Sequence, residues 1–118
     1  MGASQLRVVA LVADLMDRSR IGAAIPGAEF VRDPASCADA AVIVVDLARD
    51  PDLRALRAAA PEARVLAFGP HVDDDRLAAA RAAGADLVLA RSRFFHDPAA
   101  AVATVMSTPK TDEPDTSG

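Results

Sequence analysis

Residues 42–60 read VIVVDLARDPDLRALRAAA, and this stretch decides the fold. Its opening VIVV is β-branched and continuously apolar, as in a strand that is covered on both faces of a sheet. Its closing DLRALRAAA has helical spacing, with Leu53 and Leu56 on one side and arginines on the other. A buried strand followed by an amphipathic helix is the repeating unit of a parallel α/β sheet.

The same alternation of strand and helix extends along the chain in both directions. We expect a helix after each strand, the shortest near Ala35–Asp39, and in the first helix we expect Leu15, Ile21 and Ile25 to share the buried face. Because crossovers between parallel strands are right-handed, five such units favour an α/β fold with a doubly wound, flavodoxin-like sheet of order 2-1-3-4-5. The expected strands are Leu6–Val12, the more polar edge strand Ala28–Val31, Val42–Val45, Arg64–Phe68 and Leu87–Ala90.

Several residues mark the ends of the expected helices. Asp50-Pro51 and Asp97-Pro98 each place a capping carboxylate before a proline at the first helical position. The acidic run at 73–75 brings negative charge to a helix N-terminus, and Gly84 fits a left-handed stop after that helix.

Length and composition limit the classes of function. A chain of 118 residues fits one domain, which we place at 1–107, followed by a disordered tail at 108–118 that has two prolines and no bulky apolar residue. The net charge of -4 would repel a nucleic-acid backbone. Without a long apolar run or a signal-peptide core, we expect a soluble cytoplasmic protein that binds neither nucleic acid nor membrane.

Residue types that carry chemistry are scarce. Cys37 is the one cysteine, so no internal disulfide can form, and we interpret it as a small packing residue. One cysteine with two histidines is too few for a typical zinc site. The chain lacks the GxSxG nucleophile motif and the glycine patterns that cradle phosphates, so we expect a binding domain rather than an enzyme.

The polar candidates lie where the expected strands end. In a doubly wound sheet, ligands gather beyond the C-terminal ends of the strands, at the point where the strand order reverses. Asp14 follows the first strand, Asp46 ends the third, Gly69 and His71 follow the fourth, and Arg91 follows the fifth. The sequence therefore predicts that these positions share one edge of the sheet.

Three stretches of the chain resemble the receiver domain of bacterial two-component response regulators, and the resemblance spans residues 6–107. LAAARAAGADLVLARSRF (77–94) is similar to the fourth helix and fifth strand of that family. VIVVDLARDPD (42–52) is similar to its third strand and phosphoacceptor loop, which puts Asp46 at the acceptor position. RVVALVADLMDRSRI (7–21) is similar to its first strand and acidic loop. The resemblance implies a bacterial signalling domain.

The roles that the resemblance implies carry over incompletely to the metal site. Receivers hold Mg²⁺ with two adjacent acids after the first strand, whereas here Ala13 precedes Asp14. Metal binding by Asp14 and Asp46 is therefore expected to be weak. We expect Asp14 to serve instead as the N-cap of the following helix, and Asp17, on that helix, to face solvent rather than reach into the site.

Two further positions depart from the receiver pattern. Gly69 stands where receivers have a serine or threonine hydroxyl, and Arg91-Ser92 stands where they have lysine and a cis-proline. Arginine keeps the positive charge but presents a planar fork. Phosphoryl transfer depends on positioning and charge neutralisation, so these changes predict an inefficient phosphoryl switch. We expect the chain to need no cofactor, and Mg²⁺ is the one candidate for a bound ion.

The leading interpretation is a stand-alone pseudo-receiver that acts in regulation through protein–protein contacts, with a protein partner or as a homodimer. One alternative is an atypical receiver that is phosphorylated on Asp46. Another is a small-molecule sensor with its ligand between Asp14, Asp46 and Gly69.

The expected contact face combines the helix at 76–83, the fifth strand and the last helix, which begins at Pro98, because receivers commonly dimerise or meet their partners there. Aromatic side chains and arginine are enriched at the centres of interfaces. Phe94 and Phe95 lie in an arginine-rich segment that we expect to be a loop, and either one of them is exposed or both pack on the domain. The candidate contact residues are Arg76, Arg81, Arg91, Arg93, Phe94 and Phe95.

Overall fold

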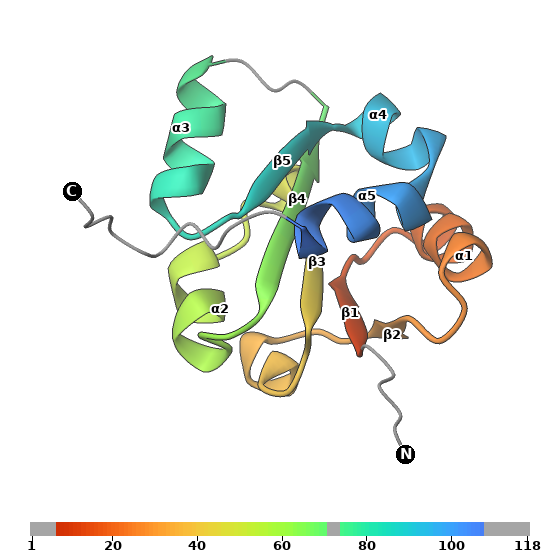
Figure 1. Cartoon of the computed structure of the whole chain (residues 1–118), viewed down its shortest axis with the longest axis horizontal. Coiled ribbons are helices and arrows are strands. Elements are labelled where there is room, and N and C mark those ends of the chain that lie inside the picture. Colours follow the sequence, from red (N-terminus) through yellow and green to blue (C-terminus); the bar gives the residue numbers. More distant parts are fainter. Residues whose placement is uncertain (1–6, 71–73, 108–118) are drawn as a thin grey trace.

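Five parallel strands form one sheet in the order β2-β1-β3-β4-β5, which confirms the predicted fold. The computed structural model describes residues 7–70 and 74–107, so the predicted tail at 108–118 and His71 lie outside the described residues. Figure 1 shows the strands and the helices around them. The strands are β1 (Val8–Leu11), β2 (Glu29–Phe30), β3 (Val42–Asp46), β4 (Arg64–Gly69) and β5 (Leu87–Ala90).

The central strand is the most deeply buried element. All five residues of β3 are buried, and Val44 lies in register with Ala10 of β1 and Leu66 of β4. The edge strand β2 is shorter than predicted, with Glu29 and Phe30 paired to β1. This shortening fits its position, because an edge strand has a neighbour on one side only and a short one limits edge-to-edge pairing.

Within residues 7–70 and 74–107, five α-helices and two 3₁₀ turns lie between the strands or follow the last one. The predicted helix near Ala35–Asp39 is the 3₁₀ turn η1, in which the Asp33 side chain caps Ser36 N at 3.1 Å. The segment after β5, which we expected to be a loop, is a helix. No side-chain cap precedes it, so the sequence lacks the usual start signal. The elements are α1 (Leu15–Ala24), η1 (Pro34–Cys37), η2 (Leu47–Arg49), α2 (Leu53–Ala59), α3 (Asp74–Ala82), α4 (Arg91–His96) and α5 (Pro98–Met106).

Two apolar cores lie on opposite faces of the sheet. On one face, Leu53 and Leu56 of α2 and Ala80 of α3 pack on β3 and β4. On the other, Ile21 of α1, Phe94 of α4 and residues of α5 form the second core. In Figure 1, α5 crosses in front of the sheet, while α2 and α3 lie to its left.

The prediction that Leu15 lies on the buried face of α1 is wrong. Ile21 is fully buried and Ile25 is half-buried, but Leu15 is 75% exposed and its neighbour Met16 is 74% exposed. A helix turns about 100° per residue, so six positions separate Leu15 from Ile21 by about 240°. The second inward position of α1 is Asp17.

The predicted helix ends are partly confirmed. Asp97 caps α5 by accepting Ala100 N at 3.1 Å, and Gly84 has a φ of 122° just after α3. The cap of α2 is Asp52, which accepts Ala55 N at 2.9 Å, and not Asp50. Asp50 instead ends η2 in the left-handed region, with a φ of 54°. The chain therefore turns at Asp50, and α2 starts two residues beyond Pro51, after its N-cap Asp52.

Candidate functional site

The predicted polar positions meet at the C-terminal edge of the sheet. Asp14 follows β1, Asp46 and Gly69 end β3 and β4, and Arg91 begins α4 directly after β5. The carboxylates lie close enough to Arg91 to raise the pKa of its guanidinium, Asp17 most strongly through a hydrogen bond and Asp46 and Asp14 through their charge. The predicted grouping of these positions at one edge is thus what the structure shows.

Asp14 occupies the N-cap of α1. Its Oδ1 accepts a hydrogen bond from Asp17 N at 3.0 Å, and its side chain is exposed. An N-cap carboxylate satisfies a backbone donor that the first helical turn leaves unpaired. The structural role that we predicted for Asp14 is therefore present in the fold.

Asp17 differs most from its prediction. It is 2% exposed rather than facing solvent, and it forms a two-pronged ion pair with Arg91, in which Nη1 lies 2.9 Å from Oδ2 and Nη2 bonds Oδ1. The physical reason is the arginine itself, because a buried carboxylate requires a charged, hydrogen-bonding partner. Asp17 lies one helical turn before the buried Ile21 and so faces inward, where the planar fork of Arg91 matches both of its oxygens.

Arg91 also lies against a cluster of aromatic rings. Its guanidinium carbon is 4.8 Å from the centre of the Phe95 ring and 5.9 Å from that of Phe68. Phe68 and Phe94 stack with ring centres 4.8 Å apart, and Phe95 meets both rings edge-on. The guanidinium of Arg91 is thus held by a carboxylate on one element and by aromatic faces on two others.

Asp46 is also committed to the backbone around it. Asp46 is 7% exposed, and its Oδ1 accepts a hydrogen bond from Ala48 N at 2.9 Å. This hydrogen bond caps the 3₁₀ turn η2. No ion pair joins Asp46 to Arg91 in the described part of the chain, since Arg91 bonds Asp17. Asp46 therefore has a structural role at the start of η2.

Gly69 allows the side chain of Leu47 to lie against the end of β4. A Cβ built on Gly69 would be 3.2 Å from the Cβ of Leu47 and 3.6 Å from its Cδ1. Real Cβ contacts are rarely this close, so any side chain at position 69 would force Leu47 to move. Leu47 is the residue after Asp46, and its side chain lies directly beside Gly69.

The predicted contact residues are not all available at the surface. Phe94 is 0% exposed in the core and Phe95 is half-buried, so the two phenylalanines both pack on the domain. Arg91 is engaged by Asp17. Arg81 and Arg93 are exposed. Phe94 is therefore removed from the candidate contact surface, because the stacking on Phe68 buries its ring.

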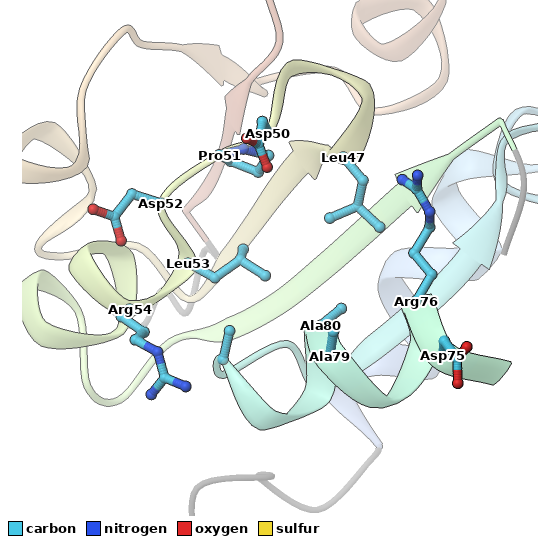
Figure 2. A pocket seen from close by; sticks show the side chains of 11 residues that line it. Leu47, Asp50, Pro51, Asp52, Leu53, Arg54, Asp75, Arg76, Ala79 and Ala80 are labelled. Carbon is cyan, nitrogen blue, oxygen red and sulfur yellow. The ribbon is translucent and has the colours of Figure 1, made fainter. Parts of the chain in front are cut away.

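A hollow of about 650 Å³ lies between α2 and α3. Figure 2 shows Leu47 and Leu53 on one side of it and Ala79 and Ala80 of α3 on the other. The small side chains of α3 leave the space open. Its rim mixes both signs of charge, with Asp75 and Arg54 among the charged side chains, so it favours no particular ligand charge.

Neither a metal site nor a membrane span is found in the described segments. Within 7–70 and 74–107, no three His, Cys, Asp or Glu side chains group closely enough to hold a metal ion. Over the same residues, no helix has the length and hydrophobicity needed to cross a bilayer.

Comparisons with known proteins find similarity in structure only. No protein-family model matches the chain, and neither does the sequence of any curated protein. A response regulator from Thermotoga maritima matches 87% of this chain with 99% of its own, at a TM-score of 0.70 and 15% identity. A response regulator from Burkholderia pseudomallei was solved with a phosphorylated aspartic acid, calcium and citrate. It matches 87% of this chain with 69% of its own, at a TM-score of 0.71 and 17% identity.

A third structure is similar over the same region. The CheY-like protein TadZ from Pseudomonas aeruginosa matches 86% of this chain with 99% of its own, at a TM-score of 0.67 and 15% identity. At these identities the shared property is the arrangement of the backbone. The chain therefore has the flavodoxin-like fold of response-regulator receiver domains.

Proposed function

We propose that this chain is a pseudo-receiver, a bacterial cytoplasmic signalling domain that acts through protein–protein contacts and carries out no chemistry of its own. The observation that carries the proposal is the commitment of its site residues to the fold. Asp46 caps η2, Asp17 holds Arg91, and Leu47 fills the space beside Gly69. A receiver-like scaffold is thus combined with a site whose polar groups are already paired.

The same contacts argue against efficient phosphoryl transfer. Transfer to a carboxylate needs cations that neutralise charge on the phosphoryl oxygens and donors that are free to reorganise around them. Arg91 would have to leave Asp17, and Asp17 would then remain as an unpaired buried charge, which is costly. Mg²⁺ would find Asp14 and Asp46 each bonded to a backbone amide.

Intact-mass measurement tests this proposal directly. The wild-type chain is incubated with Mg²⁺ and acetyl phosphate, beside Asp46→Asn and a receiver that is known to accept phosphate from this donor. We expect no mass gain in the wild type while the known receiver is modified. A gain of one phosphoryl group in the wild type that disappears in Asp46→Asn would favour the atypical phospho-receiver instead.

The proposed contact surface is the exposed side of α3, β5 and α4. Arg81 and Arg93 are exposed there, and Phe95 presents a half-buried ring that also lies 4.7 Å from the guanidinium of Arg20. Arg76 has a contact of its own within the chain, so we give it a lesser part. The occupant is a protein partner or a second copy of the chain.

Oligomeric state distinguishes the two occupants of this surface. If the surface joins two copies, sedimentation of the wild type gives a dimer, and Arg81→Glu with Arg93→Glu shifts it to monomer. Arg54→Glu, an exposed substitution on α2, is the matched control and leaves the dimer intact. A wild type that stays monomeric at all concentrations would rule out a second copy as the occupant.

A further inference from the structure

A second hollow lies at the same edge of the sheet but on the side of β2. It has a volume of about 540 Å³ and is walled by the ends of β1 and β2, the start of α1 and the connection from η2 to α2. We call it the arginine groove, because Arg18, Arg32 and Arg49 line it. It adjoins the point between β1 and β3 where the strand order reverses, which is where ligands of doubly wound sheets bind.

The charge of the groove is opposite to that of the chain. Three arginines face one acidic residue, Asp52, whose Oδ1 is bonded to Ala55 N, while the whole chain has a net charge of -4. Within the described residues, Arg32 and Arg49 form no ion pair. Unpaired arginines that gather in one groove of an acidic protein point to an anionic ligand.

Arg18 is the positioned member of the three. Its Nε donates to the carbonyl of Val12 at 2.7 Å, and its guanidinium carbon lies 5.6 Å from the centre of the Phe30 ring. These contacts fix the plane of the guanidinium, and among the described residues its two terminal nitrogens form no hydrogen bond or ion pair. A guanidinium that is held in place loses little freedom when it binds an oxyanion.

The floor of the groove is aliphatic. Leu11 ends β1, Val31 follows β2 and Leu56 comes from α2, while Leu15, which also lines the groove, is 75% exposed. An apolar floor beside a few charged groups is the usual composition of a small-molecule site, and the volume lies within the usual range for one. The ligand therefore needs an apolar body as well as an anionic group.

We propose that the arginine groove binds a small organic diphosphate, with the diphosphate on Arg18, Arg32 and Arg49 and the organic body over Leu11 and Leu56. Arginine binds phosphate oxygens through two parallel hydrogen bonds, and a diphosphate offers enough oxygens for three such residues. Asp46, Asp14 and Gly69 do not line this groove. The proposal is thus separate from the phosphoryl site and does not rest on the proposed function.

Titration followed by amide NMR tests the proposal. The probes are inorganic pyrophosphate, ADP and dimethylallyl diphosphate, added to the full chain at low ionic strength, because screening weakens exposed charge interactions. We expect saturable shifts at the ends of β1 and β2 and at the start of α2. At least one organic diphosphate should bind at least tenfold more tightly than pyrophosphate, because its body covers the aliphatic floor.

Matched arginine variants identify the site. Arg32→Gln and Arg49→Gln should each weaken binding roughly tenfold to a hundredfold, since each removes charge-assisted hydrogen bonds. Both residues are exposed, so the variants should keep the wild-type far-UV circular dichroism. Arg54→Gln, an exposed arginine outside the groove, should bind as the wild type does.

Three results would overturn the proposal. The first is the absence of saturable shifts with any of the three probes at millimolar concentration. The second is binding of pyrophosphate that is as tight as that of both organic diphosphates, which would indicate a simple anion site. The third is an equal loss of affinity in Arg54→Gln, which would indicate attraction to arginines in general.

Discussion

Arg91 is held by neighbours from three elements, and its contacts explain why an arginine stands there. Asp17 of α1 takes both prongs of the guanidinium, while Phe68 of β4 and Phe95 of α4 lie within cation–π distance of it. A lysine could not fill this place, because its ammonium is a single point of charge without a flat face. At the residue scale, Arg91 forms a fixed link between α1 and α4.

Arg91→Gln should therefore lower the free energy of unfolding. The substitution leaves the Asp17 carboxylate buried without its partner, which we expect to cost about 1–3 kcal/mol, below the usual cost for a fully buried pair because 40% of the Arg91 side chain is exposed. Urea denaturation followed by circular dichroism measures the change. Arg93→Gln, an exposed neighbour on α4, should stay within about 0.5 kcal/mol of the wild type. Equal stabilities of the two variants would show that the link is not stabilising.

Cys37 gives a pH dependence with a defined sign. Burial raises the pKa of its thiol, and the residue is 0% exposed with its Sγ 3.8 Å from the carbonyl of Asp33. Because the folded pKa lies above the unfolded one, the free energy of unfolding should be unaffected below about pH 8.5 and should fall as the pH rises beyond it. The chain has no tyrosine, so few other groups titrate in that range.

Thermal or urea unfolding at pH 7.5 and 9.5 measures this effect, with Cys37→Ala as the control that removes it. Native Cys37 should also react slowly with a thiol reagent at pH 7.5 and completely in urea, since the thiolate is the reactive form and the side chain is buried. Fast reaction in the native state would contradict the assignment of Cys37 as a packing residue.

At the scale of elements, one buried ion pair joins the end of α2 to the starts of β4 and β5. Asp86 is 3% exposed and accepts hydrogen bonds from Val65 N and from Arg57, both at 2.8 Å. Arg57 also donates to three carbonyls in the turns that lead into the two strands, those of Pro61, Ala63 and Gly84. The pair thus replaces the backbone hydrogen bonds that the turns themselves cannot make.

Asp86→Ala should be among the most destabilising single substitutions in the chain. It leaves the Val65 amide and the Arg57 guanidinium without their acceptor, at an expected cost of about 3–5 kcal/mol, against a total stability of about 5–15 kcal/mol for a domain. Asp86→Asn keeps one acceptor oxygen and should lose less. Denaturant unfolding compares both with Asp39→Ala, an exposed aspartate whose loss should cost little. A loss below 1 kcal/mol in Asp86→Ala would show that the turns form without the pair.

The elements could be predicted from the sequence where a local pattern specifies them. The buried strands are continuous apolar runs, and Asp97 and Gly84 are caps whose effect is local. The ends of parallel strands meet at one edge, so the grouping of Asp14, Asp46 and Arg91 followed from the fold alone.

Contacts between residues that are far apart in the sequence could not be predicted in this way, because no local pattern specifies them. Asp17 and Arg91 are 74 positions apart, and neither residue shows in its own neighbourhood that it pairs with the other. The contact of Leu47 with Gly69 depends on how two strand ends approach each other. The arginine groove is assembled from three separate segments, so its positive charge is hidden in a sequence whose net charge is negative.

At the scale of the whole molecule, the sheet is the common wall of two cores. Leu56 packs on one face and Ile21 on the other, and the central strand β3 contributes alternate side chains to each. Loss of either core exposes one face of the same strands, whose other face then has no rigid support. We therefore expect the domain to unfold in a single cooperative transition.

Variants on opposite faces test this cooperativity. Leu56→Ala should cost about 2–5 kcal/mol and Ile21→Val about 0.5–1.5 kcal/mol, because each leaves a cavity in a fully packed core. The faces of a sheet are separated by the sheet itself, so the two losses should add to within about 0.5 kcal/mol in the double variant. Circular dichroism and amide hydrogen exchange should report one transition for all three proteins. If Leu56→Ala instead exposed the amides of α2 and α3 while those of α1 and α5 stayed protected, the two cores would be separate folding units. The sheet would then not couple the arginine groove to the proposed contact surface on α3, β5 and α4.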